Sequence, residues 1–182
     1  MRRIWFVLGI IFVILIVIGM FLYFAMATPQ KPRTGTEILN PIEGLTKEQA
    51  ILQFNKDYIS YLVFAIGGWK LHNPPLSDDT PKIKIVADSD TYVSEIIQGQ
   101  ISTHKGDIEN EDIIIRTTKE EIVDIISSDN REEKVKESVS AGRTALELKA
   151  GYTTLFSKGY LSIYKDLTGE SFTGSVIRIF AQ

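Results

Sequence analysis

The chain has no cysteine, and this absence removes several classes of chemistry. Without a thiol there is no disulfide, no thiolate-bound metal, no cysteine nucleophile and no lipid attached to cysteine. The absence does not identify a cellular compartment, because a domain of this size folds without disulfides.

Histidine is almost as scarce, with His72 in a proline-rich segment and His104 beside a predicted turn. A metal site usually takes three protein ligands, and the chain has no H-x-H or H-x-x-x-H spacing. Acidic clusters at 78–79, 88–90 and 109–112 lack the spacing of a calcium loop, so we interpret them as turn and solvated residues. We therefore predict no metal site and no cofactor.

Three catalytic signatures are also missing. The chain has no G-x-S-x-G elbow, no phosphate-binding loop and no dinucleotide-binding fingerprint. We expect a protein that is not an enzyme.

Basic residues are in the minority once the N-terminus is set aside. Arg2 and Arg3 precede a long apolar run, and the residues from 28 onward carry 18 basic and 23 acidic side chains. An acidic domain without a basic stripe has no electrostatic footprint for nucleic acid, so nucleic acid is excluded as a partner.

Residues 4–27 carry no charge, and as a helix they would be roughly 36 Å long. This length exceeds the ~30 Å hydrocarbon core of a bilayer, and Thr28-Pro29 provides a stop. The pattern predicts an uncleaved transmembrane signal-anchor over 1–28, with the lipid bilayer as partner. The residues expected to face the membrane are Trp5, Phe6, Ile10, Leu15, Ile18, Phe21 and Tyr23.

Two other interpretations of this run are open. Ala25-Met26-Ala27 fits a signal-peptidase site, although secretory apolar regions usually span about 7–15 residues. A buried core helix is rarely apolar on every face. The basic N-terminus slightly favours a cytoplasmic N-terminus and an extracytoplasmic domain, since Lys31 and Arg33 follow on the other side.

The residues after the apolar run predict one α+β domain. We interpret 29–45 as a linker, 46–168 as the domain and 169–182 as a tail. An amphipathic helix is expected from a capping box at Thr46 to the glycines at 67–68. Later helices are expected at 119–126, 130–140 and 152–167, and strands at 82–86, 92–97, 101–103, 112–117 and 144–149.

Successive strands with short turns predict an antiparallel meander, and the consecutive isoleucines at 113–115 predict a strand buried on both faces. The order helix, four strands, two helices, strand, helix resembles that of the sterol carrier protein 2 (SCP2) family over roughly 46–167. The resemblance depends on the helix before Trp69, the strands around 88–99, the phrase DIIIRTTKEEIVDII from Asp112, and Gly142-Arg143.

This resemblance implies a five-stranded, mainly antiparallel sheet covered by helices, with an apolar tunnel between the sheet and the last helix. Apolar residues at helical spacing are core by default, so a purely structural role for them is the competing interpretation. The candidate tunnel residues are Trp69, Leu71, Leu155, Phe156, Leu161 and Tyr164.

The expected function is that of a membrane-anchored, non-enzymatic domain that binds a lipid or another apolar ligand near the bilayer. The alternative is an accessory or structural subunit of a membrane protein complex, using the segment 176–180 or the transmembrane helix as its interface.

Overall fold

The computed structural model describes residues 14–20 and 38–168 of the chain. The chain forms two compact units, Met1–Gln30 and Lys31–Gln182. In the first unit, residues 14–20 are helical and exposed. Within the described ranges, no helix has both the length and the apolarity to cross a bilayer.

Most of the predicted membrane span lies outside the described residues. Of the residues expected to face the membrane, Leu15 and Ile18 are described; Trp5, Phe6, Ile10, Phe21 and Tyr23 are not. The same holds for most of the linker and for the tail at 169–182. The anchor therefore stays a prediction.

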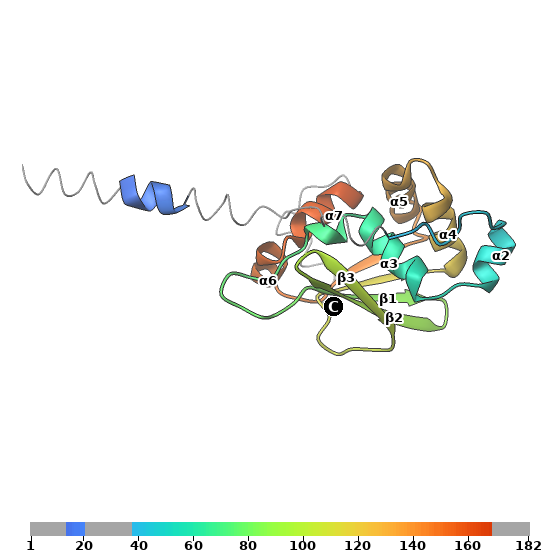
Figure 1. Cartoon of the computed structure of the whole chain (residues 1–182), viewed down its shortest axis with the longest axis horizontal. Helices are drawn as coiled ribbons and strands as arrows, with labels where there is room; N and C mark the ends of the chain where they lie inside the picture. Colours follow the sequence, from blue (N-terminus) through green and yellow to red (C-terminus); the bar gives the residue numbers. More distant parts are fainter. Residues whose placement is uncertain (1–13, 21–37, 169–182) are drawn as a thin grey trace, which may run out of the picture. The chain divides into compact units, whose positions relative to one another are not determined.

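The second unit is α+β, as expected (Figure 1). Its helices are α2 (Lys47–Leu52), α3 (Lys56–Ala65), the 3-10 turn η1 (Gly68–Lys70), α4 (Lys119–Ser127), α5 (Arg131–Ser140), α6 (Tyr152–Ser157) and α7 (Tyr160–Thr168). Its strands are β1 (Lys82–Ala87), β2 (Asp90–Ile97), β3 (Gln100–Lys105), β4 (Ile113–Thr117) and β5 (Ala145–Leu148).

Side-chain caps fix the starts of the helices. Thr46 and Gln49 form the predicted capping box, and the hydroxyl of Thr118 accepts from the backbone N–H of Glu121 at 3.1 Å. Each cap satisfies an amide that has no partner within the helix. The helix starts expected after Thr46 and at residue 119 are both confirmed.

The single helix predicted from Thr46 to the glycines is wrong, because the chain forms α2 and α3 instead. Asn55 has an extended backbone, and its side chain accepts from the N–H of Asp57 at 2.8 Å. Asparagine therefore starts a new helix where the apolar periodicity alone predicted continuation.

The glycines that end α3 are confirmed as its stop. Gly67 has φ of 87°, a left-handed conformation that favours glycine. A Cβ on Gly68 would lie 2.5 Å from Val63 Cγ1. The turn thus requires one glycine for its backbone angle and the next for space.

The five strands form one sheet in the order β3-β2-β1-β4-β5. The pairs β1–β2, β2–β3 and β4–β5 are antiparallel, whereas β1 and β4 are parallel. The sheet is mainly antiparallel as predicted, but the meander is wrong beyond β3. After β3 the chain crosses the sheet and β4 pairs with β1. In this interior position both faces of β4 are covered, which its consecutive isoleucines require.

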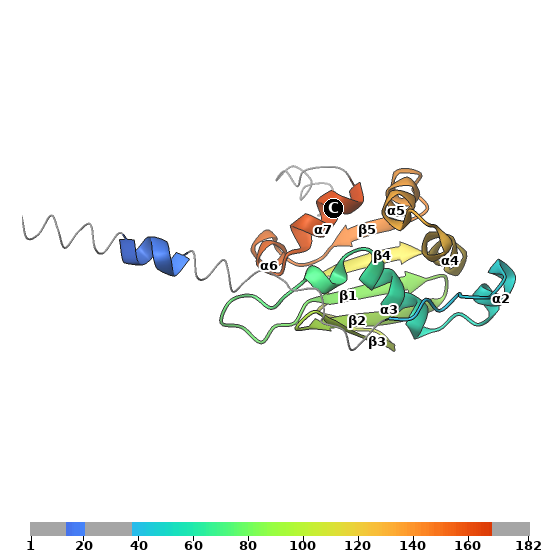
Figure 2. The ribbon, with the colours of Figure 1, turned by 45° about the horizontal axis from the view of Figure 1, so that its top comes forward.

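Helices α3 to α7 gather on one side of this sheet (Figure 2). Every second residue of a strand points toward the helices. The strand register shows that aliphatic side chains of β1, β4 and β5 lie together on this face. The strand residues on this inner face include Ile83, Ile85, Tyr92, Ile96, Ile113, Ile115, Leu146 and Leu148.

The crossover segment 106–112 shields part of the opposite face. Lys84 on that face pairs with Asp107 and Glu111 of the segment. Beside Lys84 in the register lie Val93 and Ile114, which are buried. The predicted burial of all three isoleucines in β4 is confirmed. Ile114 faces away from the helices, and the crossover segment explains why it is buried.

The single helix predicted over 152–167 is also wrong. Lys158 is the C-cap of α6, and Gly159 follows with φ of 88° before α7 begins. Both halves keep the predicted apolar spacing, so periodicity gave no sign of the interruption.

Candidate ligand-binding site

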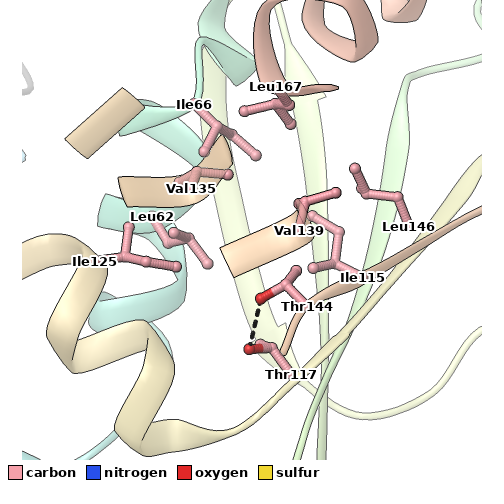
Figure 3. Close-up of a pocket in the computed structure, with 10 residues that line it drawn as sticks. All are labelled: Leu62, Ile66, Ile115, Thr117, Ile125, Val135, Val139, Thr144, Leu146 and Leu167. Atoms are coloured by element: carbon pink, nitrogen blue, oxygen red, sulfur yellow. Dashed lines mark hydrogen bonds between the residues drawn. The ribbon is translucent and has the colours of Figure 1, made fainter. Parts of the chain in front are cut away.

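An apolar cavity lies between the inner face of the sheet and the helices (Figure 3). Helices α3, α4, α5 and α7 supply one side, and strands β4 and β5 supply the other. The ten lining residues are Leu62, Ile66, Ile115, Thr117, Ile125, Val135, Val139, Thr144, Leu146 and Leu167.

Eight of these ten side chains are aliphatic, and the volume of the cavity is about 20 Å³. That is the space of roughly one water molecule, and an aliphatic lining offers water few hydrogen-bond partners. A ligand larger than water therefore enters only if the helices move away from the sheet. Their contacts across the cavity are side-chain packing, which allows such movement without breaking strand pairing.

Two threonines place hydroxyls at one end of the cavity. Thr144 donates to the hydroxyl of Thr117 at 3.0 Å, and Thr144 also lies 2.7 Å from the hydroxyl of Ser138. Because a hydroxyl has one proton, Ser138 is the donor to Thr144. The proton of Thr117 is thereby left for an acceptor at the cavity wall.

A buried ionic cluster fastens the segment between α6 and α7 to the sheet. Lys158 Nζ lies 2.9 Å from Asp112 Oδ1 and 3.0 Å from Oδ2, and it donates to the carbonyl of Thr80. The hydroxyl of Tyr160 and the backbone N–H of Lys82 both donate to Asp112 Oδ2. Burial, reinforced by the Asp112 carboxylate, raises the pKa of Tyr160 well above its ordinary value.

The cluster positions α7, which contributes Leu167 to the cavity. Asp112 stands at the start of β4, and its carbonyl accepts from the N–H groups of Lys149 and Ala150 after β5. Lys158 also accepts at its carbonyl from the N–H of His72. One aspartate therefore joins two neighbouring strands to the helical layer.

A charged groove of about 500 Å³ lies at α4 and α5. Arg143 pairs there with Glu121 and Glu137, each at 3.0 Å. Hydrogen bonds from Lys134 and then Arg143 lower the pKa of Glu137. Among residues 14–20 and 38–168, no three acidic or histidine side chains form a group able to hold a metal ion.

The six residues predicted to bind an apolar ligand are not among the ten that line the cavity. Leu71 and Leu155 are buried in the core, Leu161 packs against the core, and Trp69 and Tyr164 are half-buried. Phe156 is exposed and stacks on Tyr152. Contact of these six with a ligand stays a prediction.

The sequence pattern missed the polar residues that matter most. Thr117 and Thr144 come together only through the pairing of β4 with β5, and Asp112 was interpreted as part of a solvated acidic cluster. A usable signal was Asp112 itself, since it directly precedes three apolar residues at a strand start.

No protein-family model matches the chain, and no curated protein matches it. Solved structures with some similarity include a double mutant of the sec-alkyl sulfatase PisA1, at 14% identity over 52% of this chain and 13% of that chain, with a TM-score of 0.34. The solution structure of palmitated SCP2L2 from Aedes aegypti is 15% identical over 59% of this chain and 91% of that one, with a TM-score of 0.33.

The crystal structure of Sterol Carrier Protein 2 Like 2 from Aedes aegypti gives 10% identity over 55% of this chain and 94% of that one, with a TM-score of 0.29. TM-scores of this size do not establish a common fold. The chain spans about an eighth of the length of the alkyl sulfatase. The structure itself defines the class: an α+β domain with a mixed five-stranded sheet, helices on one face and an apolar cavity between them.

Proposed function

We propose that the protein is a membrane-anchored, non-enzymatic SCP2-like domain that binds a lipid or another apolar ligand close to the bilayer. The observation that carries the proposal is the cavity, whose eight aliphatic side chains come from both the sheet and four helices. The order of elements expected from the SCP2 resemblance also supports it, once the two broken helices are counted as pairs.

The anchor is supported by the uncharged run at residues 4–27, which is long enough to cross the hydrocarbon core. Residues 14–20 within it are helical, and their large apolar side chains are 49–61% exposed. In this proposal the N-terminus is cytoplasmic and the domain is extracytoplasmic. Tethering then favours presenting or sensing a lipid at one membrane over shuttling between membranes.

The chemistry of the cavity restricts the ligand. An aliphatic lining favours a hydrocarbon chain, because burial of apolar surface is its main source of binding free energy. Thr117 has a proton to donate at one end, so a carbonyl or carboxylate oxygen on the ligand fits there. A single-chain amphiphile satisfies both conditions.

The experiment uses the full chain purified in mild detergent, with NBD-labelled stearate as the probe. We expect the probe to bind, and native mass spectrometry to find co-purified lipid. Val139→Phe fills the cavity and should weaken probe binding by about tenfold or more, since the large side chain occupies the space that the chain needs.

Val86→Phe is the matched control, because it makes the same change on the opposite face of the sheet. It should leave probe affinity unchanged. Equal effects of the two variants, or a chain that binds no probe and carries no lipid, would contradict the proposal.

An accessory subunit of a membrane complex is the second candidate function. It is supported by Leu39 and Leu52, two large apolar side chains that are 75% and 86% exposed. Chemical crosslinking in native membranes should then recover this chain joined to a second protein. Recovery of the monomer alone would count against this candidate.

A further inference from the structure

Helix α6 presents aromatic side chains outward. Tyr152 and Phe156 are 47% and 65% exposed, and their rings stack with centroids 6.3 Å apart. The helix contains no charged residue. Exposure of two stacked rings on an uncharged surface is unusual in a chain with 24% charged residues.

The loop between η1 and β1 presents a third large apolar side chain. Leu76 lies in a turn closed by a hydrogen bond from the N–H of Ser77 to the carbonyl of Pro74, and it is fully exposed. Its φ of 61° is a left-handed conformation that is costly for leucine. The fold thus holds an apolar residue in a strained backbone, and among the residues that the structure describes none covers it.

The loop and α6 belong to the same end of the domain. The N–H of His72 donates to the carbonyl of Lys158, and Lys158 Nζ donates to the carbonyl of Thr80. Both ends of the loop are therefore bound to the residue that directly follows α6. Both views show the loop beside α6, away from α2 and α4 (Figures 1 and 2).

We propose that Leu76, Tyr152 and Phe156 form a membrane-contact end that inserts shallowly into the headgroup region of the bilayer. The proposal rests on the anchoring of the chain through residues 4–27. Residues 28–37 reach at most about 36 Å when extended, so an anchored domain stays close to the lipid surface. Tyrosine and phenylalanine are suited to this interface, because their rings are stable at the boundary of water and hydrocarbon.

The charge around this end indicates which lipid it fits. Helix α6 and residues 71–77 carry no Asp, Glu, Lys or Arg, His72 is the one titratable side chain among them apart from Tyr152, and Asp78 and Asp79 follow directly. The residues from 28 onward are acidic overall. A zwitterionic phosphatidylcholine surface therefore fits this end better than an anionic one.

The absence of cysteine makes a direct test simple, because a single introduced cysteine can carry a bimane label. The full chain is reconstituted into phosphatidylcholine nanodiscs with or without spin-labelled lipid. The spin-labelled lipid should reduce the bimane fluorescence of Leu76→Cys and of Phe156→Cys at least about twofold, as expected for residues at the headgroup level. Ser89→Cys, in the exposed turn between β1 and β2 at the opposite end of the sheet, is the control and should be unaffected.

Leu15→Cys, within the apolar run, separates this inference from the proposed function. Quenching at Leu15→Cys without quenching at Leu76→Cys and Phe156→Cys would overturn the membrane-contact end alone. No quenching at Leu15→Cys would overturn the anchor, and the inference with it. A third result is bimane emission that changes with the number of chains per disc but is not quenched by spin-labelled lipid. It would show that a second copy covers this end, and it would also overturn the inference.

Discussion

Lys158 and Asp112 form an ion pair that is almost fully shielded from solvent, although 46 residues separate them in the chain. Lys158 is 1% exposed and the Asp112 side chain 5%. Two further donors to the carboxylate, the hydroxyl of Tyr160 and the N–H of Lys82, offset part of the cost of removing these charges from water. Each of the two buried charges is stable only while the other is present. Because Lys158 lies just before α7, the pair fixes the position of that helix.

Removing one member of this pair should destabilise the domain strongly. Asp112→Ala leaves the ammonium of Lys158 buried with one carbonyl and the half-exposed Asp79 as partners. We expect the free energy of unfolding to fall by about 3–5 kcal/mol in urea titrations. Asp79→Ala removes only the exposed partner and should cost about 0–1 kcal/mol; a larger loss for Asp79→Ala than for Asp112→Ala would refute this account.

Tyr160 should make the domain sensitive to alkali. Burial raises its pKa above that of an unfolded tyrosine, so the folded state keeps a proton that the unfolded state releases. This contribution is fully present below about pH 10 and decreases as pH rises from there toward the folded-state pKa. Urea midpoints of the wild type should therefore fall more steeply above pH 10 than those of Tyr160→Phe. Parallel curves for the two proteins would contradict the assignment.

Local signals were sufficient for much of the fold. Each strand and the capped starts of α2 and α4 were predicted, because alternation and capping act over a few residues. The glycines after α3 were predicted for the same reason. The strands, the helix caps and the glycine stop are each determined by residues a few positions away in the sequence.

Long-range pairing was the part that the sequence could not specify. The parallel contact of β1 with β4 depends on which strand fills the interior of the sheet, and alternation within a strand does not determine this. The cavity residues Thr117 and Thr144 meet across a strand pair, and Asp112 is buried because Lys158 reaches it from the α6–α7 junction. The sequence therefore did not identify the residues that line this cavity, and ligand contact of the six residues named from the SCP2 resemblance stays a prediction.

Gly68 should not tolerate a side chain. A Cβ there would lie 2.5 Å from Val63 Cγ1 and 2.7 Å from the Val63 carbonyl oxygen, and the backbone oxygen has little freedom to move. Gly68→Ala should lower the free energy of unfolding by about 1–3 kcal/mol in urea titrations. Gly151→Ala is the control, since its Cβ would meet no atom within 4 Å. If both variants are equally stable, the turn after α3 adapts more readily than its geometry indicates.

The hydroxyl of Thr117 should contribute to ligand affinity through the polar group of the ligand. Thr117→Val keeps the shape of the side chain and removes the proton that Ser138 and Thr144 leave available. We expect NBD-stearate to bind about 5–10-fold more weakly, equivalent to one hydrogen bond of roughly 1 kcal/mol, whereas an NBD-labelled hydrocarbon without a carboxylate should bind as before. Thr91→Val on the opposite face of the sheet is the control and should change neither affinity. Equal losses for both probes would mean that Thr117 supports the cavity structurally, and the carboxylate would then lie elsewhere.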